Sequence, residues 1–257
     1  MERKPPSLSI VLPAYNEADS LESTIDSIWE FATTPPIPRF AKIDEIVIVN
    51  DGSSDGTLAM AQSIAERFPI RVQVTNLERN LGKGGAVRAG MSVASCDFHM
   101  FMDADGEIPI TNLKQFGSFF LTDPTAAAVA VAVGGPSVFQ GIYRQALSTG
   151  ARLIISQACN TGVRDTQRGF KLFTRQASNQ LFDALETEGW LFDVEILRRA
   201  SLAGMPIRQV EVAWEHIENR ASSVHRAALP DALRELWRIR QSSNGPTEIA
   251  TGLKLKP

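Results

Sequence analysis

Cysteine and long apolar runs are both scarce in this sequence. Its 257 residues include 2 cysteines, Cys96 and Cys159, which are too few for a disulfide framework and lack the spacing of metal ligands. The longest unbroken run of apolar and small residues, 126–135, is far shorter than the ~20 residues that span a membrane. The opening segment MERKPPSLSI has no apolar stretch of the kind that secretory signals carry. We therefore expect a soluble protein of a reducing compartment, the cytoplasm.

Two common nucleotide-binding motifs are also missing. No GxGxxG follows the first predicted strand, which argues against a nicotinamide-dependent dehydrogenase. A GxxxxGK[ST] phosphate loop is excluded because Gly84, and not Ser or Thr, follows Lys83. The histidines are scattered without metal-ligand spacing, so we assign structural roles to His99, His216 and His225. The isoelectric point near 5.7 argues against general nucleic-acid binding.

Charge is unevenly distributed along the chain. Residues 1–135 carry 10 of the 26 basic and 17 of the 29 acidic residues, residues 136–182 carry 6 and 1, and residues 183–257 carry 10 and 11. An acidic first half followed by a basic middle indicates neighbouring subsites for a cation and for an anion. The alternative is ordinary solvated surface charge.

Apolar periodicity in the first half alternates between that of strands and that of helices. Strands are expected at 8–12, 45–50, 72–74 and 98–102, helices at 20–31, 57–68 and 85–94, and the alternation continues through 111–121 and 126–133. This order predicts an α/β, Rossmann-like fold whose mostly parallel sheet carries helices on both faces. We expect a single domain over residues 1–241 and a flexible tail over 242–257.

Polar and acidic residues follow three of the predicted strands. Parallel strands end along one edge of a sheet, where open α/β sheets bind their ligands. The clusters are Tyr15–Glu17 after the first strand, Asp51–Asp55 after the second, and Asp103, Asp105 and Glu107 after the fourth. We therefore expect the three clusters to converge on one rim.

The segment Asp103-Ala-Asp105-Gly-Glu107 is a candidate metal site. Alternate residues of an extended segment point the same way, so the three carboxylates can face one point. Mg²⁺ and Mn²⁺ prefer oxygen ligands, and Mg²⁺ often bridges one or two carboxylates to substrate phosphates. The alternative is a turn in which Asp serves as a hydrogen-bond acceptor.

Asp51 and Lys83 are candidates for binding a nucleotide. Asp51 ends a strand, where it can accept hydrogen bonds from a base or a ribose, whereas a turn and a helix N-cap explain Asp55 and Thr57. Glycines around Lys83 open a helix, where backbone amides can approach an anion. Lys83 can thus contact a phosphate, and the alternative is a solvated lysine.

Five motifs occur in the order seen in inverting family 2 glycosyltransferases, and the chain resembles that family over about residues 8–240. The motifs are PAYNE at 13–17, DGSSDGT at 51–57, NLGKG at 80–84, DAD at 103–105 and GVRDTQRGFKLFT at 162–174. The last motif, with WLFDVE at 190–195 and VAW at 212–214, is similar to the dolichyl-phosphate glucosyltransferase branch, near the dolichol-phosphate mannose synthases. The resemblance implies a GT-A fold with a nucleotide-sugar half at about 8–135 and an acceptor half at about 136–241.

The resemblance also implies roles for individual residues. The nucleotide-sugar site would comprise Pro13, Tyr15, Glu17, Asp51, Lys83 and Asp103. Mg²⁺ or Mn²⁺ on the diphosphate would be held by Asp103, Asp105 and Glu107, where related synthases often have Gln in place of the Glu. The acceptor phosphate would be gripped by Arg144 and Arg168. The run Gly134-Gly135-Pro136 departs from the Ser-Arg often found there, so one phosphate contact of the family is absent or supplied elsewhere.

The implied reaction is metal-dependent, inverting transfer of a hexose, glucose from UDP-glucose, to polyprenyl or dolichyl phosphate. Such a phosphate is anionic near neutral pH, since the second pKa of a monoester is ~6, and it needs no strong base. Two alternatives stay open: the same fold with a GDP-mannose donor or a soluble hydroxyl acceptor, and a catalytically silent nucleotide-sugar binding module. A hydroxyl acceptor would need a base, for which Asp165 is the candidate unless it pairs with Arg164 or Arg168. The candidate catalytic residues are Asp105, Arg144 and Asp165.

Residues 228–240 predict how such a protein reaches a lipid. One apolar stripe of the predicted helix, with arginines around it, consists of Leu229, Leu233, Leu236 and Trp237. That pattern suits a helix on anionic headgroups, so we expect peripheral contact with the cytoplasmic membrane face. The alternative is a helix packed on its own domain, and residues 138–155 have the same two interpretations.

Overall fold

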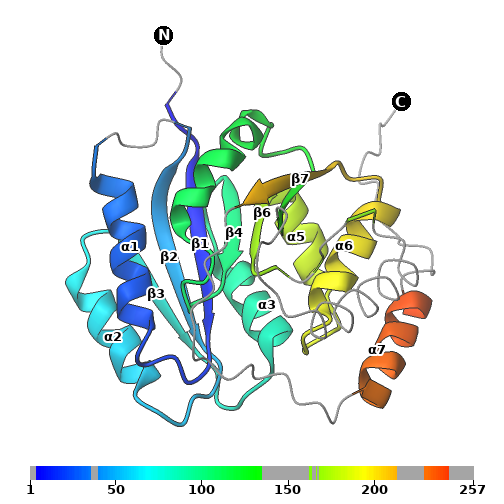
Figure 1. Ribbon diagram of the computed structural model, residues 1–257, viewed down its shortest axis with the longest axis horizontal. Helices are drawn as coiled ribbons and strands as arrows, with labels where there is room; N and C mark the ends of the chain where they lie inside the picture. Colours follow the sequence, from blue (N-terminus) through cyan, green and yellow to red (C-terminus); the bar gives the residue numbers. More distant parts are fainter. Residues whose placement is uncertain are drawn as a thin grey trace, which may run out of the picture.

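A seven-stranded sheet lies between two layers of helices in the computed structural model (Figure 1). The structure describes residues 4–35, 40–134, 162–163, 166, 168–212 and 229–242. Its strands are β1 (Ser7–Ala14), β2 (Lys42–Asn50), β3 (Arg71–Asn76), β4 (Phe98–Met102), β5 (Val129–Gly134), β6 (Phe170–Thr174) and β7 (Ile207–Val212). Its helices are α1 (Leu21–Thr33), α2 (Thr57–Arg67), α3 (Lys83–Val93), the 3₁₀ helix η1 (Ile110–Leu121), α5 (Arg175–Asp183), α6 (Phe192–Leu202) and α7 (Leu229–Ser242).

The sheet is mostly parallel, in the order β3-β2-β1-β4-β6-β5-β7. Strands β3, β2, β1 and β4 run parallel to one another, and β7 runs parallel to β5. Strand β6 is antiparallel to both β4 and β5, with Phe170 opposite Met102. The predicted α/β class with a mostly parallel sheet is confirmed. The antiparallel β6 brings residues 168–171 to the carboxyl end of β4, beside the predicted rim.

The central strands are buried on both faces, which explains their nearly continuous apolar sequences. In β2, Ile46 and Ile48 pack toward α1, α2 and η1, whereas Val47 and Val49 pack toward α3, α5 and α6. Helices cover both faces of the sheet (Figure 1), and each face has its own apolar core.

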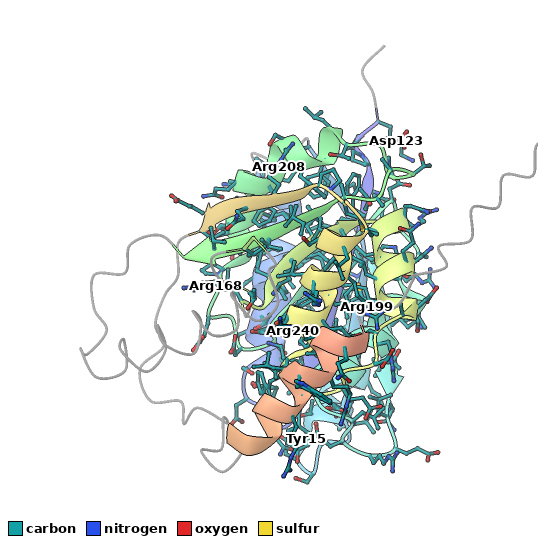
Figure 2. The ribbon with its side chains drawn as sticks, turned by 90° about the vertical axis from the view of Figure 1, so that its right-hand side faces the viewer. Tyr15, Asp123, Arg168, Arg199, Arg208 and Arg240 are labelled. Carbon is teal, nitrogen blue, oxygen red and sulfur yellow. The ribbon has the colours of Figure 1, made fainter. Side chains whose placement is uncertain are left out.

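Helix α7 packs against α6 at the edge of the molecule (Figure 2). A small apolar cluster joins the two helices and consists of Leu191, Val194, Leu236 and Ile239. The Arg198 guanidinium donates to the Arg240 carbonyl at 3.3 Å. Trp237 is 65% exposed, so the predicted stripe is divided: Leu236 faces inward and Trp237 faces outward. Within the described residues, no helix combines the length and the apolar character needed to cross a bilayer.

Candidate active site

The loops after β1 and β2 are tied together at the carboxyl end of the sheet. Asn16 adopts a left-handed backbone conformation (φ 57°), which aims its side chain at the second loop. The Asn16 N–H donates to Ser53 Oγ at 3.0 Å, and its side-chain oxygen accepts from the Ser54 N–H at 2.9 Å. The clusters after these two strands therefore converge, as the parallel topology predicts.

The predicted nucleoside-binding residues of the first loop lie on this rim. Pro13 pairs with Val49 within the sheet, and Tyr15 is 49% exposed. The Glu17 N–H donates to Thr57 Oγ1 at 2.8 Å, which anchors the end of the loop on the start of α2. These positions leave Tyr15 open to a ligand, and its contact with a nucleoside stays a prediction.

Asp55 shapes the start of α2 as a turn residue, as predicted, but the N-cap position itself is occupied by Gly56. Its Oδ1 accepts a hydrogen bond from the Thr57 N–H at 2.9 Å, and its Oδ2 accepts from the Ala18 N–H at 3.3 Å. The carboxylate therefore has a local structural role.

Asp51 lies beneath the loop that precedes α3, and its side chain is buried. Its Oδ1 accepts from the Leu81 N–H at 2.7 Å, and its Oδ2 accepts from the Gly82 N–H at 3.0 Å. Burial raises the pKa of the Asp51 carboxyl, although these two hydrogen bonds oppose the shift. Both oxygens thus hold the loop, and the contact of Asp51 with a base or ribose stays a prediction.

Lys83 is not a solvated lysine, because only 12% of its side chain is exposed. Its Nζ lies 2.6 Å from Asp103 Oδ1 and 5.1 Å from the centre of the Trp190 ring. Burial lowers the pKa of Lys83, but the charges of Asp103 and Asp193 more than offset this effect and raise it above its ordinary value. Lys83 is therefore a fixed cation at the N-terminus of α3, where an anion is favoured.

Asp103 and Asp105 form a pair of mutually repelling carboxylates after β4. Burial raises the pKa of Asp105 to about 6, and repulsion from Asp103 adds to the shift. The Glu107 N–H donates to Asp105 Oδ1 at 3.0 Å, so Glu107 contributes its backbone to this turn. A divalent cation would relieve the repulsion between the two carboxylates.

The predicted grip of three carboxylates is not formed in this conformation. Among the residues that the structure describes, no three His, Cys, Asp or Glu side chains are arranged to hold a metal ion. The oxygen donors of Asp103 and Asp105 nevertheless fit Mg²⁺ or Mn²⁺, since such ions are often held by one or two carboxylates together with substrate phosphates. A role for Glu107 as a third ligand stays a prediction.

Gly169 packs directly on the Asp103 carboxylate. The Asp103 N–H donates to the Gly169 carbonyl at 3.1 Å. A Cβ added at Gly169 would lie closer than 3.0 Å to Oδ1, Oδ2 and Cγ of Asp103, a separation that real Cβ atoms essentially never show. A glycine is therefore required here.

Arg168 is the only predicted acceptor-site residue within the described part of the chain. Its guanidinium lies over Gly134 at the end of β5, where an added Cβ would overlap it. Gly169, its neighbour in sequence, contacts Asp103, so Arg168 is adjacent to the candidate metal site. Arg144 and Asp165 lie outside the described residues, as do Cys159, His216 and His225.

The segment before α6 covers the start of α3. Glu195 is buried and accepts hydrogen bonds from the Glu186 and Thr187 N–H groups at 3.2 and 2.8 Å. The Glu188 carbonyl accepts from the Gly85 N–H at 3.1 Å. This framework places Trp190, which is 50% exposed, beside Lys83. Trp190 belongs to the WLFDVE motif, but no spacing in the sequence indicates its contact with Lys83.

Lys171 and Asp193 form a buried ion pair that the sequence analysis missed. Lys171 Nζ lies 2.7 Å from Asp193 Oδ1, and the two side chains are 0% and 3% exposed. A lysine between Phe170 and Leu172 in a strand was the available signal, because a buried charge requires a partner.

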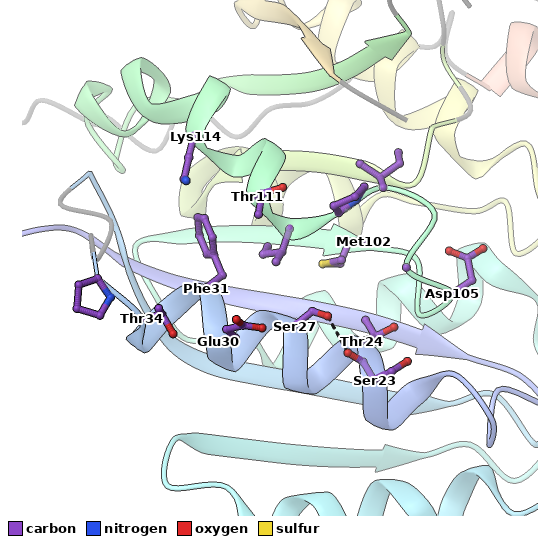
Figure 3. Close-up of a pocket in the computed structure, with 15 residues that line it drawn as sticks. Ser23, Thr24, Ser27, Glu30, Phe31, Thr34, Met102, Asp105, Thr111 and Lys114 are labelled. Carbon is purple, nitrogen blue, oxygen red and sulfur yellow. Dashed lines mark hydrogen bonds between the residues drawn. The ribbon is translucent and has the colours of Figure 1, made fainter. Parts of the chain in front are cut away.

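A cavity of about 580 Å³ lies between α1 and η1 (Figure 3). Asp105 and Gly106 line one end, and Thr34 and Pro35, just beyond α1, line another part of its wall. Ser23 and Ser27 contribute polar groups, so the lining is mixed in character. The cavity adjoins the candidate metal site and extends from it along α1.

Known proteins are similar to this chain in sequence. The model of the family described as glycosyl transferase family 2 matches residues 9–182. A dolichyl-phosphate beta-glucosyltransferase of Homo sapiens is 34% identical over 221 residues, which cover 82% of this chain and 68% of that protein. One of Dictyostelium discoideum is 32% identical over 222 residues, which cover 82% and 67%.

Solved structures share the fold. Glucosyl-3-phosphoglycerate synthase from Mycobacterium tuberculosis, in complex with Mn²⁺, UDP and phosphoglyceric acid, aligns with a TM-score of 0.64 at 20% identity. The alignment covers 96% of this chain and 82% of that one. The expected GT-A fold is thereby confirmed. From the matched family model and these relatives, we conclude that the chain is a glycosyltransferase and belongs to glycosyl transferase family 2.

Proposed function

We propose that the protein transfers glucose from UDP-glucose to the phosphate of a polyprenyl or dolichyl phosphate, with inversion at the anomeric carbon. The observation that carries this proposal is the group formed by Lys83, Asp103 and Asp105 at the carboxyl end of the parallel strands. The relatives named dolichyl-phosphate beta-glucosyltransferase support the sugar and the acceptor. The structures of the mycobacterial synthase with Mn²⁺ and UDP-glucose support the donor and the metal.

The donor site would use charges that the fold already positions. Asp103 and Asp105 would hold Mg²⁺ or Mn²⁺, which when bound neutralises charge on the departing diphosphate. Lys83 presents a cation at the N-terminus of α3, where the helix dipole also favours an anion. Asp51 keeps the loop before Lys83 in place through its two backbone hydrogen bonds. The exposed Tyr15 is the candidate contact for the base.

The acceptor site would lie on the β5–β6 side, where Arg168 is found. An acceptor phosphate carries its own negative charge, so positioning and charge stabilisation supply most of the catalysis. Arg168 would attract this phosphate, and Arg144 would be its second contact. A phosphate oxygen then attacks the anomeric carbon from the side opposite the leaving UDP, and an α-linked donor gives a β-linked product.

Peripheral contact with the cytoplasmic face of a membrane is part of the proposal, because the acceptor is a lipid. Helix α7 supports it, since Trp237, Arg238 and Arg240 are exposed while Leu236 and Ile239 pack inward. An exposed Trp among arginines suits anionic headgroups. Sedimentation with vesicles of anionic phospholipid tests this contact, and Trp237→Ala should reduce the bound fraction.

The decisive experiment incubates the purified protein with Mn²⁺, radiolabelled nucleotide sugars and two acceptors. Transfer of glucose from UDP-glucose to polyprenyl phosphate is expected. Transfer of mannose from GDP-mannose, and not of glucose, would show that the donor is GDP-mannose. Transfer only to 3-phosphoglycerate would favour a soluble hydroxyl acceptor, an alternative that the complex of the mycobacterial synthase with phosphoglyceric acid makes worth testing. Binding of UDP without any transfer would identify a silent binding module and contradict the proposal.

A further inference from the structure

Four charged side chains alternate in sign from the core layer around α6 to the rim. Their order is Lys171, Asp193, Lys83 and Asp103. The inner pair is joined by Lys171 Nζ and Asp193 Oδ1 at 2.7 Å, and the outer pair by Lys83 Nζ and Asp103 Oδ1 at 2.6 Å. The pairs interact, because Asp193 raises the pKa of Lys83 after the larger effects of burial and of Asp103.

The inner pair is costly for the fold. Both side chains are almost fully buried, and Lys171 Nζ lies 5.2 Å from the centre of the Phe101 ring, within the apolar layer. Burial lowers the pKa of Lys171 and raises that of Asp193, so the surroundings oppose both charges. Well-packed apolar residues of similar volume are often as stabilising as a buried ion pair. Stability alone therefore does not account for these two charges.

The inner pair contacts or adjoins the two segments that hold the outer pair in place, one beside Asp103 and one beside Lys83. Lys171 Nζ donates to the Arg168 carbonyl at 2.5 Å, and the next residue, Gly169, packs on Asp103. Asp193 lies in the first turn of α6, directly after the segment that covers the start of α3. One partner thus fixes the backbone beside Asp103, and the other lies next to the support of Lys83.

We propose that Lys171 and Asp193 are positioning residues for the donor-diphosphate site. They fix the positions of the Lys83 and Asp103 side chains relative to each other at the rim. Lys171 holds the backbone beside Gly169 and thereby the Asp103 carboxylate, and the negative charge of Asp193 acts together with that of Asp103 to hold the Lys83 ammonium. Neither residue of the inner pair touches substrate. This inference rests on the proposed function, because it assigns the outer pair to the donor.

A charge-neutral double variant, Lys171→Met with Asp193→Leu, removes the inner pair without leaving one buried charge alone. UDP affinity is measured by calorimetry with and without Mn²⁺, and acylation of the Lys83 amine is followed by mass spectrometry. We expect UDP binding in Mn²⁺ to weaken by about 10–100-fold, as for partners that orient metal ligands. We also expect faster acylation of Lys83 and thermal unfolding close to that of the parent.

Arg71→Met is the matched control. Arg71 Nη1 lies 3.1 Å from Oε1 of the buried Glu45, at the opposite end of the strands, so this variant also takes a cation from a buried carboxylate. Glu45 keeps hydrogen bonds from Ser9 Oγ and the Ser95 N–H. UDP affinity and Lys83 acylation should match those of the parent.

The outcomes separate this inference from the proposed function. A folded double variant that binds UDP as the parent does and protects Lys83 equally would overturn the inference. If the double variant does not fold, Asp193→Asn is measured instead, and the same loss of UDP affinity is expected. Loss of transfer by Asp193→Asn with unchanged UDP affinity would make Asp193 a base and also overturn it. A parent that does not bind UDP would contradict the proposed function, while the acylation rates would still test the inner pair.

Discussion

Substitution of Gly169 by alanine should damage the donor site while leaving the fold intact. The new Cβ would come closer than 3.0 Å to three atoms of the Asp103 carboxylate, which has to move by about 1 Å. That movement also separates Asp103 from Lys83, whose Nζ lies 2.6 Å from Oδ1. A misplacement of this size can reduce the rate about 100-fold, which corresponds to about 2.7 kcal/mol. Overpacking of this kind typically lowers the free energy of unfolding by about 1–3 kcal/mol, so we expect the variant to stay folded.

The assay for Gly169→Ala is sugar transfer together with calorimetric binding of UDP and Mn²⁺, and thermal unfolding reports stability. Gly117→Ala is the matched control, because a Cβ there would meet Phe40 Cδ1 at an ordinary 3.5 Å. We expect the control to behave as the parent in all three measurements. Parent-like transfer and binding by Gly169→Ala would refute the reasoning, because donor binding and transfer would then not depend on the position of the Asp103 carboxylate.

Four further predictions concern metal, acceptor and pH. Asp105→Ala should abolish transfer, and full turnover by this variant would contradict the metal assignment. Chelation by EDTA should stop transfer, and added Mn²⁺ should restore it. Arg144→Ala should mostly raise the KM for the acceptor in steady-state kinetics, with a smaller change in kcat. Burial lowers the pKa of His99 to about 4 from 6.5, so the unfolded state takes up this proton first. Stability should therefore fall by up to about 3 kcal/mol as pH drops through that interval. In urea unfolding at a series of pH values, the free energy of unfolding of His99→Gln should fall less steeply at acid pH than that of the parent.

Much of the sheet could be predicted because its central strands are buried on both faces. The strand expected at 98–102 has those bounds, and the one expected at 45–50 begins earlier, at Lys42. Parallel order then predicted that the clusters near Tyr15, Asp51 and Asp103 share one rim. Hydrogen bonds join the first two loops. Asp51 holds the loop before Lys83, and Lys83 contacts Asp103, which joins the third cluster to the second.

The pairing of charges could not be predicted in the same way. Lys83 and Asp103 are 20 positions apart, and the chain offers 29 acidic residues as partners for any lysine. Local periodicity carries no information on such choices, because they depend on how distant elements pack. For the same reason nothing in the sequence placed β6 between β4 and β5, where Lys171 reaches Asp193.

The location of β6 limits how this enzyme can be divided into fragments or recombined with other chains. The strand comes from the later part of the chain, yet it separates two strands of the earlier part, and the residue directly before it is the glycine against Asp103. A fragment that ended at residue 134 would expose the edge of β4 and lack one wall of its own cation site. Grafting a foreign acceptor region onto this chain would accordingly require a glycine in the same register, or donor recognition would be lost along with acceptor choice.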